Sequence, residues 1–325
     1  MSQIDQKNLT KKYINNGYCI GPTLFEDNQV AYLRKSFEDT FSKKGFPRDI
    51  SLFDISDQET VRIILNAIDS EWIQSIFKEI GNYFNTSISP LPIFDIQRNY
   101  HVDRIKSPGV GWHRDCNGEM PYDYCREKLF DKSYVFGKIG IYLQENLEYG
   151  GSIDLIPFSH KDIKAKNIII NKLTNIPLKL LLRLHSNFPE IYKNISENIY
   201  MNMLKAKKLS PKKGSVVLFD SRIYHRGSPI ADSVRNEVMF NSSVHHAEVP
   251  AAKNKYSIYC HFGSSLAYDS YMYDRLKREG NSLELQRCVN EQKKIENFYP
   301  KFASSIQNIM SPVLIKYKDY ISKVS

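Results

Sequence analysis

The sequence predicts a mainly β protein with helical additions, built on a jelly-roll core. Runs with strand-like alternation recur from about residue 91, separated by Gly, Pro, Asn and Ser. Such short, punctuated strands are typical of a two-sheet β barrel or jelly roll. The runs read PIFDIQRNYHV, YVFGKIGIYLQE, GSIDLIPFS, GSVVLFDSRIYH and RNEVMFNSSVHH.

Helical spacing appears outside these runs and in one interruption of them. An α/β segment is expected over residues 1–90, and helices are expected again over residues 263–325. Residues 161–210 are rich in Lys and Asn and read as a mostly helical insertion between the third and fourth runs. The prediction is therefore one domain, with its jelly-roll core in residues 91–160 and 211–262.

Composition narrows the class of protein. With 42% apolar and 25% charged residues, the chain of 325 residues can bury a substantial core. The five cysteines are scattered and form no C-x-x-C pair, which argues against a disulfide framework and a zinc site. No apolar stretch approaches the length of a membrane span and no leader is evident, so we expect a cytoplasmic, soluble protein. The formal charge of +9 is spread among compensating acids, so nucleic acid is not an expected partner.

A His-x-Asp pair in GWHRD carries the chemistry. Residues two apart on a strand point to the same side, so His113 and Asp115 can both face one cavity while Arg114 faces away. Arg114 is expected at the surface in a salt bridge. An imidazole and a carboxylate need one more histidine to make a 2-His-1-carboxylate iron site, which leaves positions open for substrate and dioxygen.

His225 is the candidate for that second histidine. It ends the run GSVVLFDSRIYH, which reads as one strand with Val217, Phe219 and His225 on the same alternating face. The turn-forming residues that follow predict a hairpin in which Arg235 lies opposite His225. An arginine there suits the far carboxylate of 2-oxoglutarate, because its guanidinium is planar, permanently charged and bidentate.

The chain resembles the phytanoyl-CoA dioxygenase (PhyH-like) family of Fe(II)/2-oxoglutarate oxygenases, whose core is cupin-like. The resemblance covers most of residues 10–245 apart from the insertion, and lies in four blocks that occur in the family's order. They are the entry segment YINNGYCIGPTLFEDNQVAYLRKSFED, the strand GWHRD, the stretch IYLQENLEYGGSIDLIPFSHK, and KKGSVVLFDSRIYHRGSP followed by Arg235. The third block departs from the family pattern at Phe158, where the family usually has Gly.

The resemblance implies roles for individual residues. His113, Asp115 and His225 would ligate Fe(II), and Arg235 would bind the distal carboxylate of 2-oxoglutarate. Gln97 and Ser228 fall near positions that contact the co-substrate in the family, although a strand residue bonding its neighbours explains Gln97 equally well. The upstream pair His101 and Asp103 lies outside the matching block.

The expected activity is that of a dioxygenase. With O2 and 2-oxoglutarate as co-substrates, it would hydroxylate an unactivated C–H bond of a small metabolite and release succinate. Halogenating relatives have Gly or Ala in place of the metal-binding carboxylate, so the presence of Asp115 favours hydroxylation. The basic balance favours an anionic metabolite or an activated sugar as substrate. Two alternatives stay open, a non-catalytic jelly-roll module that binds carbohydrate or protein, and a nucleic-acid oxygenase, which only the positive charge supports. Neither the exact substrate nor the oligomeric state follows from the sequence.

Overall fold

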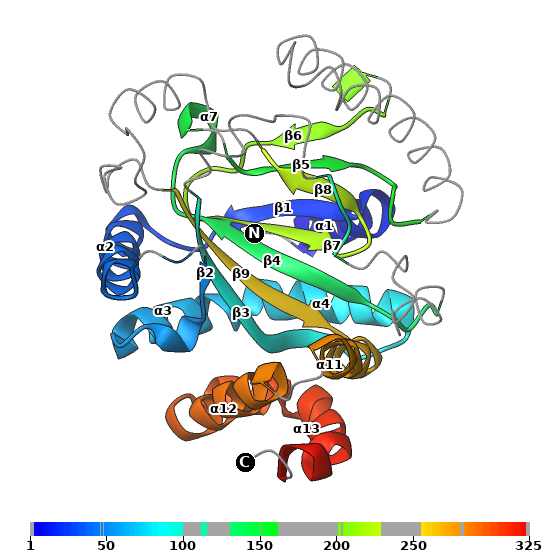
Figure 1. Cartoon of the computed structure of the whole chain (residues 1–325). Helices are drawn as coiled ribbons and strands as arrows, with labels where there is room; N and C mark the ends of the chain where they lie inside the picture. Colours follow the sequence, from blue (N-terminus) through cyan, green and yellow to red (C-terminus); the bar gives the residue numbers. More distant parts are fainter. Residues whose placement is uncertain are drawn as a thin grey trace, which may run out of the picture.

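The computed structural model contains two antiparallel β-sheets packed face to face, with helices on the outer side of the larger one (Figure 1). It describes residues 3–45, 47, 49–99, 112–115, 131–149, 151–161, 201–202, 204–228, 255–279 and 283–322. The larger sheet has the strand order β1-β7-β4-β9-β3-β2 and the smaller one β6-β5-β8. The bounds of the strands are β1 Tyr18–Thr23, β2 Asp49–Ile50, β3 Ser89–Asn99, β4 Phe136–Tyr142, β5 Ile153–Ile156, β6 Lys207–Leu209, β7 Ser215–Asp220, β8 Tyr224–Gly227 and β9 Lys255–Gly263.

The pairing of these strands is that of a jelly roll. Residues 112–115 extend the smaller sheet, because His113 forms an isolated antiparallel bridge with His225 of β8. Counted along the chain from β3, the first strand then pairs with the eighth (β3 with β9), and the second with the seventh (112–115 with β8). The third pairs with the sixth (β4 with β7), and the fourth with the fifth (β5 with β6). The predicted fold class is confirmed.

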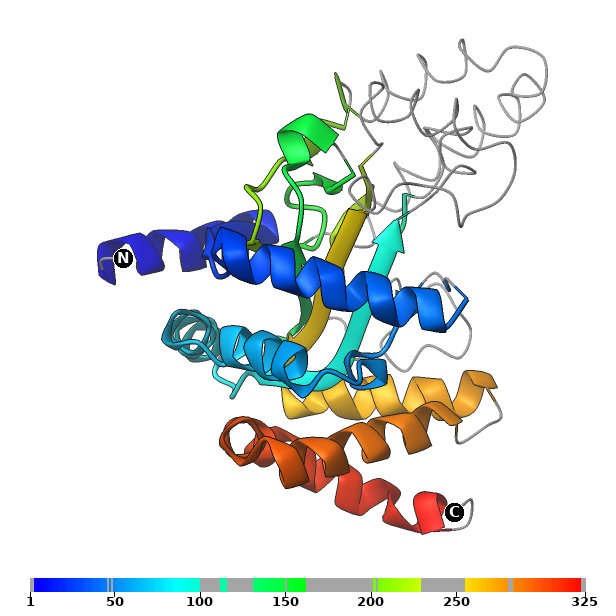
Figure 2. The same ribbon diagram turned by 90° about the vertical axis from the view of Figure 1, so that its left-hand side faces the viewer.

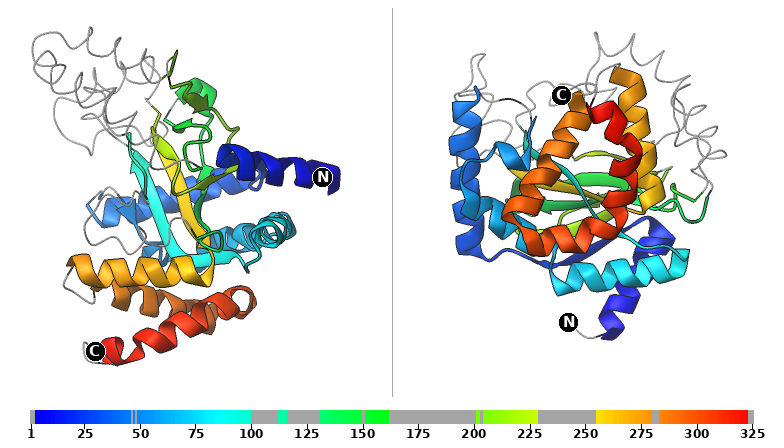
Figure 3. Two further views of the ribbon diagram at one scale, coloured as in Figure 1. Left: turned by 90° about the vertical axis from the view of Figure 1, so that its right-hand side faces the viewer. Right: turned by 90° about the horizontal axis from the view of Figure 1, so that it is seen from below.

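Helices surround the larger sheet. Figures 2 and 3 show the C-terminal helices stacked against one end of it, with the N-terminal helices along its side. The helices are α1 Gln3–Asn16, α2 Asp27–Lys43, the 3-10 helix η1 Leu52–Asp54, α3 Gln58–Ile68, α4 Glu71–Phe84, α7 Asn146–Tyr149, α11 Ser265–Glu279, α12 Leu283–Phe298 and α13 Pro300–Ser322. In the described part of the chain, no helix combines the length and apolar character needed to cross a membrane.

The larger sheet has one apolar cluster on each face. The first lies between this sheet and the helices and takes Ile139 and Ile141 from β4. The second lies between the two sheets and takes Tyr142 from β4 and Phe219 from β7. Alternation along β4 therefore sends Lys138, Gly140 and Tyr142 into the space between the sheets.

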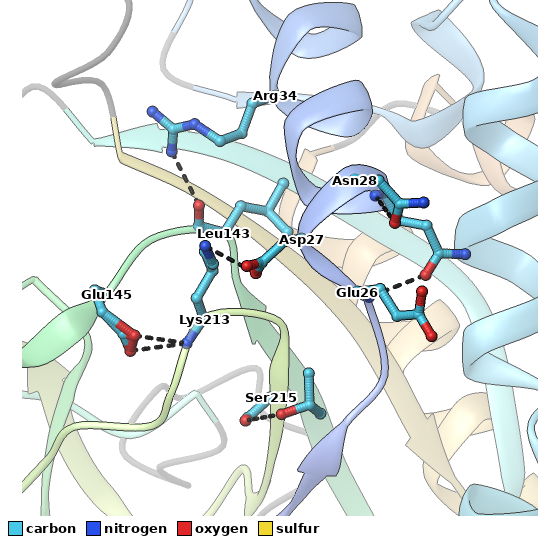
Figure 4. Close-up of polar contacts among 10 residues, drawn as sticks. Glu26, Asp27, Asn28, Arg34, Leu143, Glu145, Lys213 and Ser215 are labelled. Atoms are coloured by element: carbon cyan, nitrogen blue, oxygen red, sulfur yellow. Dashed lines mark hydrogen bonds and ion pairs between the residues drawn. The ribbon is translucent and has the colours of Figure 1, made fainter.

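Polar contacts join α2 to the loops beside the core (Figure 4). Arg34 donates a hydrogen bond of 3.0 Å to the carbonyl of Leu143, just after β4. Lys213, just before β7, pairs with Asp27 at 2.9 Å, and its backbone N–H donates to the carboxylate of Glu145. These contacts fix the ends of β4 and β7, two of the strands that carry side chains on the interior face.

Two expectations about the core are wrong in detail. The run GSVVLFDSRIYH is two strands, since β7 belongs to the larger sheet and β8 to the smaller one. Asp220 makes the turn between them by accepting hydrogen bonds from the backbone N–H and the guanidinium of Arg222. Strand β6 falls inside the predicted insertion of residues 161–210 and pairs with β5, so the core resumes before residue 211. Residues 162–200 of that segment lie outside the described part.

Phe158 has a left-handed backbone conformation, with φ of 65°. A non-glycine residue in this region costs roughly 1–2 kcal/mol, because Cβ approaches the following carbonyl. The turn is held in place by the N–H of Phe158, which donates to the carbonyl of Asn16 at 3.0 Å. The position at which the sequence departs from the family's Gly is therefore one that favours Gly.

We expect Phe158→Gly to raise the free energy of unfolding by about 0.5–1 kcal/mol, since relief of the left-handed strain exceeds the entropic cost of Gly. The ring is half-exposed, so little packing is lost. Phe158→Ala is the matched control, because it removes the ring but keeps Cβ. Urea unfolding curves that show the same stability for both variants would contradict this explanation.

Candidate metal centre

His113, Asp115 and His225 meet at the mouth of the space between the sheets. Their ligand atoms all lie within 4.8 Å of one another. Each Nε2 atom, that of His113 and that of His225, lies 3.6 Å from an oxygen of Asp115. Neighbouring ligands on an octahedral ion with bonds of about 2.1 Å are separated by about 3 Å, so the three groups are close to the spacing that a metal requires.

Backbone pairing sets this arrangement. The N–H of His113 donates to the carbonyl of His225 at 2.8 Å, and the N–H of His225 donates to the carbonyl of His113 at 2.9 Å. Directly opposed residues of an antiparallel pair project their side chains to the same face, and the two imidazole rings lie 4.5 Å apart. Asp115, two residues after His113, returns to that face.

Side chains on the opposite face of the smaller sheet anchor the segment 112–115. The ring of Trp112 stacks on that of Tyr224 at 5.8 Å, with an angle of 7° between the ring planes. The guanidinium of Arg226 lies 5.0 Å from the centre of the Trp112 ring and pairs with the carboxylate of Asp154 at 2.9 Å. Trp112 thus holds one side of His113 against the sheet.

Arg114 anchors the other side of His113. It is 5% exposed and donates a hydrogen bond of 3.1 Å to the carbonyl of Ser159. Its guanidinium also lies over the ring of Tyr224. The expected surface position is wrong because this outer face of the sheet is itself covered, although Arg114 does face away from the triad as predicted.

The histidine tautomer at His225 suits metal binding. Its Nδ1 atom lies 3.0 Å from the carbonyl of Ile223, which can only accept, so Nδ1 carries the proton. The Nε2 lone pair is then free and faces Asp115. A hydrogen bond of this kind to the non-ligating nitrogen orients histidine ligands in metal sites.

Charges around the triad keep its groups in the form that binds a cation. Burial lowers the pKa of His225 to about 4, which outweighs the attraction of Asp115. Burial opposes ionisation of Asp115, but Lys138 and the two histidines outweigh it, so the pKa of Asp115 is well below its ordinary value. At neutral pH, His225 is therefore neutral and Asp115 ionised. A neutral imidazole and a carboxylate fit a divalent ion such as Fe(II).

Lys138 is the charged neighbour that the sequence analysis missed. Its Nζ lies 2.9 Å from Oδ2 of Asp115, and both side chains are 18% exposed. Burial lowers the pKa of Lys138, but Asp115 more than compensates and raises it above its ordinary value. A signal existed in the sequence, since Lys138 is the single charged residue in the apolar run YVFGKIGIYL.

The structure brings together the three predicted ligands, and it describes two of the three predicted co-substrate residues, Gln97 and Ser228. Ser228 donates a hydrogen bond of 2.6 Å to Asp154, which β5 and β8 place on the opposite face from His225, so it is not in the site. Gln97 faces the interior from β3, paired with Ser257. Within the described residues no hydrogen bond joins it to the triad. Arg235 lies outside the described residues, as do His101 and Asp103.

The predicted hairpin between His225 and Arg235 lies, on the Arg235 side, outside the described residues. One edge of β8 is occupied at His225 by Leu155 of β5, and the other edge by His113. Both neighbours of His225 across the strands are therefore among the described residues. The role of Arg235 as a carboxylate clamp remains a prediction that does not depend on this pairing.

Comparisons with known proteins give weak similarities. No protein-family model and no curated protein match the sequence. AviO1 from Streptomyces viridochromogenes Tue57 is 11% identical with a TM-score of 0.43, and the match covers 81% of this chain and 97% of that one. HygX from Streptomyces hygroscopicus, with nickel and 2-oxoglutarate bound, is 12% identical with a TM-score of 0.44, covering 81% and 87%. EctD from S. alaskensis, with bound Fe, is 12% identical with a TM-score of 0.43, covering 82% and 77%. These scores are too low to support an inference about activity.

The depressed pKa of His225 predicts that the metal-free protein loses stability in mild acid. Between about 6.5, the ordinary pKa of histidine, and 4, the unfolded chain binds a proton at this position that the folded chain does not. Stability therefore falls as the pH falls, by about 2 kcal/mol for this group between pH 7 and pH 5.

Urea unfolding at several pH values measures this slope, and His225→Gln is expected to reduce it. Burial also lowers the pKa of His160, which contributes in the same direction. The double variant with His160→Gln should therefore flatten the slope further. An unchanged slope in His225→Gln would contradict the assignment.

Proposed function

We propose that this chain is an Fe(II)/2-oxoglutarate-dependent dioxygenase that hydroxylates a small, anionic metabolite, and that it belongs with the PhyH-like enzymes that its motifs resemble. The observation that carries the proposal is the meeting of His113, Asp115 and His225 within 4.8 Å at the mouth of a jelly roll. Two imidazoles and one carboxylate occupy one side of an ion and leave its other positions for ligands. Such an open site is typical of catalysis, because structural metals are closed by protein ligands.

The roles of the chain's own residues follow from their positions. His113, Asp115 and His225 would hold the ion, and the carbonyl of Ile223 fixes the orientation of His225. When bound, Fe(II) and 2-oxoglutarate supply the oxidising chemistry, in which dioxygen is consumed, 2-oxoglutarate loses carbon dioxide to become succinate, and a substrate C–H bond is hydroxylated. Arg235 would bind the distal carboxylate of 2-oxoglutarate. Asp115 occupies the position that a halogenase would leave open for chloride, so hydroxylation is the expected outcome.

The environment of the triad supports the binding of a divalent ion. Asp115 and His225 carry the charge states that bind a divalent cation at neutral pH, and the anchoring of Trp112 and Arg114 holds the ligand strand in one position. Pre-positioned ligands of this kind favour tight and geometrically defined binding. The alternative of a non-catalytic binding module has no comparable feature among the described residues.

Removal of a ligand is expected to abolish turnover. The protein is loaded anaerobically with Fe(II) and 2-oxoglutarate, exposed to oxygen, and assayed for succinate across a panel of anionic metabolites. Asp115→Ala and His225→Ala should each reduce succinate release at least about 100-fold, because two remaining ligands hold the ion weakly. His160→Gln is the matched control, since this buried histidine lies against the end of α1, where its Nε2 contacts the carbonyl of Ile14. Iron-independent succinate release, or none with any metal, would overturn the proposal.

The clamp is tested separately with Arg235→Met. Loss of a bidentate contact to the distal carboxylate should raise the KM for 2-oxoglutarate by about 10–100-fold, the effect of losing roughly 1.5–3 kcal/mol of charge-assisted hydrogen bonding. The affinity for the metal alone should not change. An unaltered KM would show that another cation binds the co-substrate.

A further inference from the structure

Lys138 is placed where it interacts with the metal centre from inside the protein. It projects from β4 into the space between the sheets, while its neighbours Ile139 and Gly137 take the other orientation along the strand. Across the larger sheet it is flanked by Phe219 of β7 and His261 of β9. The strand therefore holds the ammonium group beside Asp115 on a rigid element.

The ammonium and the ion would use the same carboxylate of the triad. Oδ2 of Asp115 lies 2.9 Å from Nζ of Lys138, and the same Oδ2 is the oxygen nearer to Nε2 of His225, at 3.6 Å. An ion bound to Oδ2 would share this oxygen with Lys138 or displace the lysine, whereas an ion bound to Oδ1, 3.6 Å from Nε2 of His113, would leave the lysine contact in place. The lysine consequently acts as a substitute for the metal in the ion-free protein.

Binding of a divalent ion changes what Lys138 requires. Two cations then lie a few ångströms apart in a partly desolvated space, where their repulsion is weakly screened. A carboxylate that binds the ion or lies directly beside it would neutralise both. Two tyrosines give this part of the interior a polar lining. The Lys138 ammonium lies 6.0 Å from the ring centre of Tyr259, and the hydroxyl of Tyr259 lies 3.3 Å from that of Tyr142.

We infer that Lys138 couples the two binding events, because it neutralises Asp115 until a divalent ion arrives and then pairs with the anionic co-substrate or substrate at the ion. This inference rests on the proposed function. It assigns to Lys138 a positioning role distinct from that of the distal clamp, since Lys138 acts at the ion end of the ligand. By reciprocity, the ion should raise the affinity for the anion by the factor by which the anion raises the affinity for the ion.

Lys255 offers a matched control for this role. It is also a buried lysine, 5% exposed, on the same face of the same sheet, with its ammonium 5.2 Å from the ring centre of Tyr142. It lies six positions along β9 from His261, the partner of Lys138, which is about 20 Å along the strand. Lys255 therefore tests the effect of removing another buried positive charge from the same face of the sheet.

The experiment measures the dissociation constant of Mn(II), a redox-inert probe, by calorimetry with and without saturating 2-oxoglutarate. Wild type, Lys138→Met, Lys138→Arg and Lys255→Met are compared after circular dichroism and thermal melting have confirmed folding. For Lys138→Met we expect Mn(II) to bind several-fold tighter without the anion, and the enhancement by 2-oxoglutarate to fall at least tenfold. The enhancement of Mn(II) affinity that remains in this variant comes from chelation of the ion by 2-oxoglutarate. Lys138→Arg, which retains the charge, and Lys255→Met should keep the wild-type enhancement within about threefold.

The outcomes separate this inference from the proposed function. If Lys138→Met weakens Mn(II) binding equally with and without 2-oxoglutarate, Lys138 only supports Asp115 and the coupling is refuted. An unchanged enhancement in Lys138→Met, or an equal loss in Lys255→Met, refutes it as well. In each of these cases wild type still binds Mn(II) and 2-oxoglutarate, so the proposed function survives. If wild type binds no Mn(II), both fail.

Discussion

The paired backbone hydrogen bonds between His113 and His225 are the constraint on which the site depends. They join the second and seventh strands of the jelly roll, which are more than one hundred residues apart in the sequence. They also fix the two imidazoles on one face and, through the period of the strand, bring Asp115 back to it. Trp112 and Arg114 reinforce the pairing from the opposite face. The two neighbours of His113 in the sequence therefore hold the segment that carries His113 and Asp115 in place.

The two faces of the larger sheet have different roles, since the outer face contributes to stability and the inner face carries groups of the site. Its outer face packs Ile139 and Ile141 against the helices and buries an extensive apolar cluster. This cluster allows the inner face to carry Lys138 and two tyrosine hydroxyls, groups that stabilise a core poorly and are tolerated only where they are paired. Alternation along a single strand, β4, thus assigns one set of side chains to folding and the other to the site.

The sequence allowed the ligands to be predicted because their positions follow from local rules. The spacing of His113 and Asp115 is the period of a strand, and His225 follows an alternating apolar run. The break of that run into β7 and β8 was not predictable. The turn is made by an ion pair between Asp220 and Arg222, and in the sequence these two residues look like exposed polar residues. Arg114 was predicted to face the right way but in the wrong environment, because burial depends on what covers a sheet. Ser228 was misplaced for the same reason, as its partner Asp154 is 74 residues away.

The two occupied edges of His225 also limit how a co-substrate can be held. A hairpin that placed Arg235 beside His225 would follow from local sequence alone, with the metal ligand and the cation for the co-substrate side by side. With Leu155 on one edge of His225 and His113 on the other, the described strands that border the site from the larger sheet are β4, β7 and β9. Among the described residues, the positive charge that lies beside Asp115 comes from across the space between the sheets. Lys138 supplies this charge from β4. Its position beside Asp115 depends on how the two sheets pack against each other.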